Sequence, residues 1–216
     1  MTADTHDRPL RADAERNRGR ILTAAADVFA ERGLGASLDE VAAAAGVGVG
    51  TVYRRFADKD ALIDALFEEK FRAVAALGEE ALTHEDPWEA FRSFMYGVCR
   101  LQAADRGLKE AMLSRDRGSE RVAAARDTIA PVAMRLLQRA KAAGAVRADL
   151  GAFDVPMMHF AVGFVAERTR DVAPEFWERV FTILLDGLAA RPNLTPMPSP
   201  PLDPEQFAAA MSRGRR

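Results

Sequence analysis

Apolar residues recur at helical spacing along almost the whole chain. In the first stripe Ile21, Ala25 and Phe29 follow one another at intervals of four, and comparable stripes run through the rest of the sequence. This spacing is typical of amphipathic helices, whereas strands alternate apolar and polar residues, which no segment sustains. The pattern predicts an all-α fold with about nine helices, at residues 12–33, 38–45, 48–56, 58–82, 87–104, 108–114, 119–143, 154–170 and 174–190.

Capping and breaking residues refine these boundaries. Ser37 stands three residues before Glu40, which is the pattern of a capping box, and it should open the second helix. Pro131 falls inside an otherwise helical stretch, so the helix there is expected to be kinked or split. Residues 192–204 hold six of the 11 prolines, which predicts that the tail over residues 191–216 is flexible and disordered.

The segment SLDEVAAAAGVGVGTVYRRF, residues 37–56, has the pattern of a helix-turn-helix. A capped short helix leads into a tight turn at Gly46 and then into a second short helix. The second helix should bury its apolar residues and expose a polar, aromatic and cationic surface formed by Thr51, Tyr53 and Arg54. Gly48 and Gly50 at its start are poor helix formers. Glycine there suits a close approach of the backbone to another surface, such as the major groove of DNA.

The spacing of this segment leaves one alternative open and excludes another. A glycine-rich turn followed by an amphipathic helix also occurs in helical proteins that bind no DNA. A nucleotide-binding loop is excluded, because GVGVGT fits neither G-x-G-x-x-G nor G-x-x-x-x-G-K-[ST] and follows a helix rather than a strand.

Composition narrows the class of protein. A chain of 216 residues with 49% apolar side chains and a net charge of −2 does not have the composition of a disordered protein. The single cysteine, Cys99, cannot form an intramolecular disulfide. The apolar runs are too short to cross a bilayer and the N-terminus lacks a signal-peptide core, so a soluble, cytoplasmic protein with no membrane contact is expected.

The net charge near zero is an average over unlike segments. Residues 8–20 carry five arginines against two acidic residues, and residues 46–59 carry Arg54, Arg55 and Lys59 against Asp58. These two segments could contact phosphates although the whole chain is slightly acidic. For residues 8–20 two interpretations stay open, a solvated tail or an arm along the DNA backbone or in the minor groove.

Residues 18–66 resemble the DNA-binding domain of the tetracycline-repressor (TetR) family. The resemblance rests on an Ile-Leu-x-Ala-Ala-x-x-x-Phe helix, an Ala-x-x-Ala-Gly-Val turn and the run Gly-Thr-Val-Tyr-x-x-Phe-x-x-Lys. The C-terminal half is similar, more weakly, to the regulatory domain of a TetR subgroup. The implied organisation is an N-terminal arm (1–11), a DNA-binding domain (12–60), a helical effector-binding and dimerisation domain (61–190) and the tail (191–216).

The resemblance implies which residues meet DNA. Tyr53 and Lys59 should contact phosphate, and Ser37 should place the N-terminus of its helix against a backbone phosphate. Base contacts would come from Thr51 and its neighbours, although Val49 lacks the polar side chain often found there, so the operator sequence is not predicted. The implied set is Ser37, Gly48, Val49, Gly50, Thr51, Tyr53, Arg54, Lys59 and Arg20.

The resemblance also implies a homodimer that binds a palindromic operator, because one recognition helix contacts too few base pairs. The dimer contact is expected on the last two long helices, through Phe164, Trp177, Phe181, Leu184 and Leu188. The effector pocket is expected among the aromatic, methionine and polar residues Phe67, Phe71, Trp88, Phe91, Met95, Cys99, Met112, Met134 and His159. For each of these the alternative is ordinary core packing.

The predicted function is repression relieved by an apolar small molecule, without a cofactor or a bound metal. An enzyme is disfavoured, since His6, His84 and His159 are scattered and no H-E-x-x-H, nucleophile elbow or spaced Cys/His set occurs. A helical adaptor without DNA binding and a TetR-type activator remain as alternatives.

Overall fold

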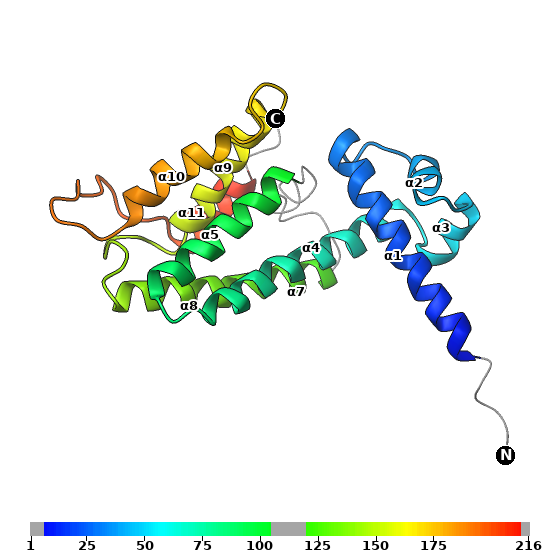
Figure 1. Ribbon diagram of the computed structural model, residues 1–216, viewed down its shortest axis with the longest axis horizontal. Helices are drawn as coiled ribbons and strands as arrows, with labels where there is room; N and C mark the ends of the chain where they lie inside the picture. Colours follow the sequence, from blue (N-terminus) through cyan, green and yellow to red (C-terminus); the bar gives the residue numbers. More distant parts are fainter. Residues whose placement is uncertain (1–6, 105–119, 213–216) are drawn as a thin grey trace, which may run out of the picture. The chain divides into compact units, whose positions relative to one another are not determined.

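The computed structural model describes residues 7–104 and 120–212, and within these ranges it contains ten α-helices and no strand longer than an isolated bridge between Val146 and Ala189 (Figure 1). The all-α prediction is confirmed. The chain divides into two compact units, Met1–Phe67 and Glu68–Arg216. The helices are α1 (Asp7–Arg32), α2 (Leu38–Ala45), α3 (Val49–Arg55), α4 (Lys59–Leu82), α5 (Pro87–Ala104), α7 (Glu120–Asp127), α8 (Ile129–Ala142), α9 (Asp154–Thr169), α10 (Phe176–Leu188) and α11 (Pro204–Ser212).

The first unit packs α1, α2, α3 and the start of α4 around one apolar core. Its fully buried side chains include Ile21, Phe29, Val41, Val52 and Leu62. Burial of such side chains stabilises a fold by about 1.5–3 kcal/mol each. The core therefore holds the two short helices α2 and α3, which are too short to be stable by themselves.

Local signals fix the two ends of α2. Ser37 and Glu40 form the predicted capping box, with the Glu40 carboxylate accepting from the Ser37 N–H at 2.7 Å. Gly46 ends the helix in the left-handed region, at φ 63° and ψ 39°, where a side chain is unfavourable. Its N–H and that of Val47 donate to carbonyls of the last turn. This cap makes the sharp turn that leads into α3.

The second unit is a layered arrangement of helices in which α5 packs against α8, α9 and α10. Its core contains Met95 and Cys99 from α5 together with Trp177 and Phe181 from α10. On the other side, α4 approaches α8 so closely that a Cβ on Gly78 would lie 2.7 Å from a methyl group of Val132. A larger residue at position 78 would push the two helices apart.

One predicted helix start was wrong, and the predicted interruption near Pro131 is present but lies slightly earlier in the chain. Helix α1 begins at Asp7 rather than at residue 12. The predicted helix 119–143 is split at Thr128, whose hydroxyl donates to the Ala125 carbonyl at 2.6 Å, so the break precedes Pro131. Pro131 lies in the first turn of α8, where an N–H has no partner within the helix and its absence costs little. The predicted helix 108–114 lies outside the described residues.

The prediction of a disordered tail was wrong for residues 204–212, which form α11. Asp203 and Gln206 cap this helix reciprocally, each side chain accepting a hydrogen bond from the other residue's N–H. Phe207 is buried and stacks on Phe153, with ring centroids 4.5 Å apart. Upstream, Arg147 donates to the Thr195 carbonyl at 2.8 Å. The sequence does contain the start signal of this helix, a capping residue followed by proline at the first helical position. The prediction of disorder considered only the number of prolines.

Candidate functional site

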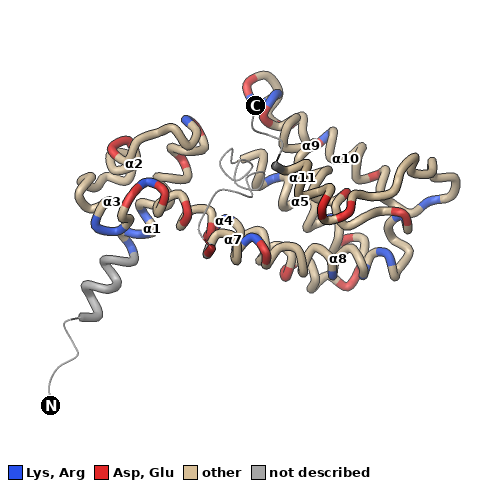
Figure 2. Tube along the Cα trace, turned by 180° about the vertical axis from the view of Figure 1, so that it is seen from behind, with Lys and Arg blue, Asp and Glu red and all other residues tan. Residues whose placement is uncertain are grey.

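Helix α3 has one face in the core and one in solvent. Val52 is fully buried and Phe56, just after the helix, is 5% exposed. On the opposite face Tyr53 is 54% exposed, an unusual position for a large aromatic ring, and Arg54 and Arg55 beside it are exposed. Lys and Arg positions gather around α3 (Figure 2). The second helix therefore presents the aromatic and cationic surface that the sequence predicted.

The two glycines at the start of α3 have open space around them. A Cβ built on Gly48 or Gly50 would meet no heavy atom within 4 Å, so packing inside the chain does not require glycine at either position. Arg54 folds back along the helix, donating to the Gly50 carbonyl at 3.1 Å and to the Thr51 hydroxyl at 3.4 Å. Lys59 lies with its ammonium 6.0 Å from the centre of the Phe29 ring. The arginine contacts are weak enough to be exchanged for contacts to another molecule.

The N-terminus of α2 is occupied by its own cap. Arg32 donates to the Glu40 carboxylate at 2.5 Å, and the Ser37 hydroxyl lies 2.9 Å from it. Hydrogen bonds from the Ser37 backbone and hydroxyl, followed by Arg32, lower the pKa of Glu40 to about 2. The N–H and hydroxyl of Ser37 are thus used inside the cap. A phosphate at this helix end would have to bind N–H groups farther into the first turn.

Arg20 does not extend toward the α3 surface. Its guanidinium donates to the Ala45 carbonyl at 2.8 Å and lies 3.5 Å from the Gly46 carbonyl. These carbonyls belong to the end of α2, where a cation also complements the helix dipole. In this structure Arg20 connects α1 to the turn before α3, and its predicted contact with DNA stays a prediction.

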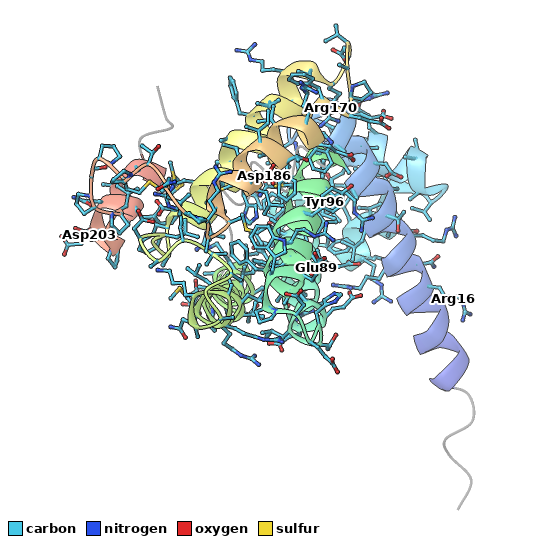
Figure 3. The ribbon with its side chains drawn as sticks, turned by 60° about the vertical axis from the view of Figure 1, so that its left-hand side comes forward. Arg16, Glu89, Tyr96, Arg170, Asp186 and Asp203 are labelled. Carbon is cyan, nitrogen blue, oxygen red and sulfur yellow. The ribbon has the colours of Figure 1, made fainter. Side chains whose placement is uncertain are left out.

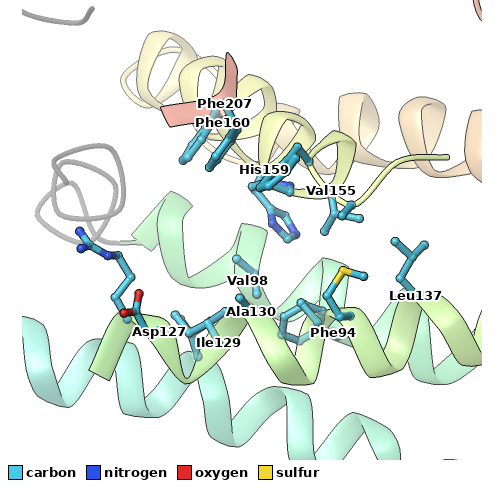
Figure 4. Close-up of a pocket in the computed structure, with 17 residues that line it drawn as sticks. Phe94, Val98, Asp127, Ile129, Ala130, Leu137, Val155, His159, Phe160 and Phe207 are labelled. Carbon is cyan, nitrogen blue, oxygen red and sulfur yellow. The ribbon is translucent and has the colours of Figure 1, made fainter. Parts of the chain in front are cut away.

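A cavity of about 270 Å³ lies in the second unit (Figure 4). Helices α5, α7, α8, α9 and α11 contribute to its wall, together with Val74 of α4. Apolar side chains make up most of the lining, and the polar ones are Arg126, Asp127 and His159. Small-molecule sites in proteins have this composition, an apolar wall with a few polar groups.

Only two of the predicted pocket residues, Met134 and His159, line the cavity. Cys99 is buried in the core, where desolvation raises its pKa to about 12, and Met112 lies outside the described residues. The six predicted pocket residues that are not among its lining residues are Phe67, Phe71, Trp88, Phe91, Met95 and Cys99. Tyr96 of α5 (Figure 3) lies outside this lining, where its hydroxyl donates to Glu178 at 3.1 Å and its ring packs on Trp177. Helical spacing shows that such residues face inward but not whether they meet a neighbour or a void.

The prediction missed several cavity residues. Ile129, Ala130 and Ala133 lie at the start of α8, just after the break at Thr128. Phe207 lies in α11, in the tail for which the sequence predicted disorder. Val155 and Pro156 lie on the same face of α9 as His159, four and three residues before it, and Phe160 directly follows it. Extending the helical pattern around His159 would have found Val155 and Pro156.

His159 is the buried polar group of the cavity. It is 4% exposed, and its ring lies edge-on to Phe94 at a centroid distance of 6.2 Å. Desolvation lowers the pKa of His159 to about 4, although a hydrogen bond to the Met95 backbone opposes the shift. The imidazole is therefore neutral at neutral pH. Across the described ranges, no group of three His, Cys, Asp or Glu side chains is placed to hold a metal ion.

The predicted dimer residues fall into two groups. Trp177, Phe181 and Leu188 are buried inside a single copy, against α5 and α9, so they offer no contact face to a partner and that prediction is corrected. Phe164 is 54% exposed and Leu184 is half-buried. The amphipathic stripe of α10 serves the chain's own core, which the sequence could not distinguish from an interface.

The exposed α3 surface and the capped turn before it define a helix-turn-helix DNA-binding protein. The model described as bacterial regulatory proteins, tetR family, matches residues 21–66, and the model described as transcriptional regulator SbtR-like, C-terminal domain, matches residues 86–190. The chain belongs to the TetR family of transcriptional regulators.

Relatives of known structure agree with this assignment. A TetR transcription regulatory protein from Mycobacterium vanbaalenii is 37% identical, with 84% of this chain and 99% of that chain covered at a TM-score of 0.62. The TetR transcriptional regulator SCO0520 from Streptomyces coelicolor is 29% identical, with 80% and 98% covered and the same TM-score. The HTH-type transcriptional regulator SAR0097 from Staphylococcus aureus is 34% identical over 88 residues, 39% of this chain and 46% of that protein, so the match spans about half the curated relative's length. None of the described helices is long and apolar enough to cross a membrane.

Proposed function

We propose that this protein is a cytoplasmic homodimeric repressor that binds a palindromic operator and is released by a small apolar effector. The observation that carries the proposal is the exposed face of α3, where Tyr53 and Arg54 stand in solvent above a fully buried Val52. A solvent-exposed aromatic ring beside arginine on a short, firmly packed helix is suited to contact with a DNA backbone and its groove.

The roles along α3 follow from what each side chain can donate. The Tyr53 hydroxyl donates to a phosphate, and such a contact fixes register without selecting sequence. Thr51 and the bare glycine backbone lie at the start of the helix, where recognition helices meet base edges. Arg54 can leave the Gly50 carbonyl and pair with guanine or a phosphate. Lys59, at the start of α4, supplies a further positive charge.

The dimer contact uses the exposed stripe of α9 and α10. Phe164 and Arg168 of α9, and Phe176 and Ile183 of α10, are exposed at positions that recur with helical spacing. Ile183 is 62% exposed, and Gly187 one turn later has open space around it, so a second helix can approach closely. Burial against a second copy would remove this apolar surface from water.

The cavity is the effector site in this proposal. Val74 of α4 lies in its wall, and the same helix carries Leu62 and Leu66 of the DNA-binding core. A ligand that displaces Val74 would therefore shift one continuous helix, and with it the spacing of the two recognition helices in the dimer. Such coupling requires the ligand to favour one arrangement by about 1–3 kcal/mol.

Selection of bound sequences from randomised DNA duplexes tests the DNA-binding part. The purified protein should enrich an inverted repeat whose half-sites are separated by about one helical turn or a multiple of it. Tyr53→Phe should weaken binding to the selected and to scrambled duplexes alike, by about tenfold for one hydrogen bond to phosphate. Thr51→Val should change the selected sequence itself.

Thr83→Val is the matched control, because Thr83 is an exposed threonine at the end of α4 outside the DNA-binding unit. It should leave both affinity and selected sequence unchanged. Recovery of duplexes with no repeated half-site, or a Thr51→Val protein that selects the same sequence with the same affinity, would contradict the proposal.

A further inference from the structure

The cavity is small and almost entirely apolar. Its volume of about 270 Å³ lies just below the range of about 300–1,000 Å³ usual for small-molecule sites. Aliphatic and aromatic side chains from five helices and from Val74 surround it, including the stacked pair Phe153 and Phe207. Such a lining favours compact apolar molecules over highly polar ones.

Among the described residues, this wall holds a buried hydrogen-bond acceptor without a partner. The imidazole of His159 points into the cavity toward Phe94 and Val98 (Figure 4). Its Nε2 is buried and meets no hydrogen-bond partner within residues 7–104 and 120–212. A hydrogen bond to the Met95 backbone raises the pKa of His159, as a ring N–H donating to a carbonyl does, and Nε2 is the nitrogen without a partner; the proton is therefore assigned to Nδ1 and the lone pair to Nε2. Leaving such a group unpaired is unfavourable, so buried acceptors of this kind are rare.

A lone water molecule would satisfy this acceptor poorly. A buried water needs two to four polar partners, and in the described part of the wall the other polar side chains are those of Arg126 and Asp127. Asp127 lies away from the imidazole in the close-up, across Ile129 and Ala130 (Figure 4). A ligand can fill the apolar space and donate to Nε2 at the same time, which a water molecule cannot.

We propose that the effector is a compact, neutral, apolar molecule that carries one hydroxyl group, and that this hydroxyl donates a hydrogen bond to Nε2 of His159. The inference rests on the proposed effector role of the cavity and specifies the chemistry of the ligand. A carboxylate beside His159 would place negative charge against the Nε2 lone pair, so a neutral donor is favoured at this position. Arg126, the cationic residue of the described wall, lies beside Asp127 at the end of α7. The neutral state of His159 at neutral pH agrees with an acceptor role.

The tail contributes to this selectivity. Phe207 of α11 closes part of the wall, yet the family model of the C-terminal domain ends at residue 190. The volume of the cavity therefore depends in part on α11, which lies outside the matched domain. A ligand that fits this cavity need not resemble the ligands of relatives that share only residues 86–190.

Three two-ring probes of closely similar shape test the proposal by isothermal titration calorimetry at neutral pH, without DNA. They are 4-phenylphenol, which has the donor, 4-fluorobiphenyl, which lacks it, and biphenyl-4-carboxylate, which is anionic. The wild-type protein should bind 4-phenylphenol about tenfold more tightly than 4-fluorobiphenyl, the factor expected for one buried hydrogen bond, and should not bind the carboxylate measurably.

Three variants test whether His159 causes the preference for 4-phenylphenol over 4-fluorobiphenyl. His159→Phe keeps an aromatic ring but removes the acceptor, and should bind the two neutral probes equally. His159→Gln restores an acceptor and should recover part of the preference. Met134→Leu, a volume-conserving change in the same wall, should alter the affinities for the two neutral probes by the same factor. The wild-type ratio is informative even where a variant does not fold.

The proposal is overturned if the wild type binds both neutral probes equally, if it prefers the carboxylate, if none of the probes binds, or if the preference persists in His159→Phe. DNA release is measured separately, by adding 4-phenylphenol to the protein bound to its selected duplex. Binding with the expected preference but without release leaves the ligand assignment standing and contradicts the effector part of the proposed function.

Discussion

His159 illustrates how a single residue takes its chemistry from its surroundings. In solvent it would titrate near pH 6.5, but in the cavity wall desolvation lowers its pKa to about 4. Between these values the unfolded chain binds a proton at His159 and the folded chain does not. The free energy of unfolding therefore falls as the pH falls through this window, by up to about 1.4 kcal/mol per pH unit.

His159→Phe should remove this part of the pH dependence. Urea unfolding followed by tryptophan fluorescence between pH 7 and about 4.5 measures it, because Trp88 and Trp177 both lie in the second unit. The exposed His84 provides the control, since His84→Phe should keep the wild-type slope. An unchanged slope in His159→Phe would show that other groups dominate in this range.

Glu40 is a second residue whose charge is held by its neighbours. The Ser37 and Arg32 hydrogen bonds keep its pKa near 2, so the cap of α2 is fully formed above the ordinary value of 4.5 and weakens only as the pH falls toward 2. The cap and His159 thus respond to acid in different windows, with His159 first.

At the scale of elements, the turn between α2 and α3 depends on a contact from α1. Arg20 donates to the last carbonyls of α2, which otherwise have no partner within the helix. These hydrogen bonds connect the turn before α3 to α1, the longest helix of the unit. This role differs from the direct DNA contact that the resemblance suggested for the same residue.

Arg20→Ala should lower the stability of the first unit by about 1 kcal/mol and weaken binding to all DNA sequences. Helix unfolding followed by circular dichroism should begin at a lower denaturant concentration than in the wild type, because the first unit is less stable. The transition followed by tryptophan fluorescence, which reports on the second unit, should stay in place. Arg55→Ala, a change at an exposed arginine of α3, should leave both transitions unchanged. If Arg20→Ala instead kept full stability and only reduced the salt dependence of DNA binding by about one phosphate contact, Arg20 would be a phosphate ligand.

The cavity, like the turn before α3, depends on contacts between helices that are distant in the sequence. The break at Thr128 separates α7 from α8 and places Ile129 and Ala130 in the wall, while α11 adds Phe207. Each of these elements has a local signal in the sequence. Their meeting around one cavity does not, because it depends on segments about 80 residues apart along the chain.

At the scale of the whole molecule, the proposed dimer combines two weakly specific helices into one operator-specific protein. The stripe of exposed apolar residues on α9 and α10 is the surface available for this purpose. With a net charge of −2 the chain gains little from general attraction to DNA, so affinity should depend on two correctly spaced α3 helices.

Ile183→Glu and Phe164→Glu should each convert the dimer to a monomer, because an unpaired carboxylate would be buried at the contact. Light scattering after size-exclusion chromatography measures the mass, and gel shift should show at least a tenfold loss of affinity for the selected duplex. Ala76→Glu, on the exposed side of α4, is the control and should remain dimeric. Dimers of full operator affinity in both variants would place the contact elsewhere.

The fold class, the helix-turn-helix and its exposed residues could all be predicted from the amino-acid sequence. These features follow from short-range rules, since the Ser37 to Glu40 cap, the Gly46 turn and the helical spacing of apolar residues each act within a few positions. Tyr53 could be assigned to the outer face because Val52 and Phe56 beside it fix the inner one.

The amino-acid pattern could not show whether an inward-facing residue packs in the core or lines a cavity; that depends on contacts between distant segments. Helical spacing places Cys99, Trp177 and His159 alike on buried faces, but the first two pack in the core and the third lines a cavity. Likewise, Phe181 and Ile183 belong to one apolar helix, yet one is buried and the other exposed. The physical reason is that burial depends on which side chains from distant segments fill the space opposite, and no local pattern records that.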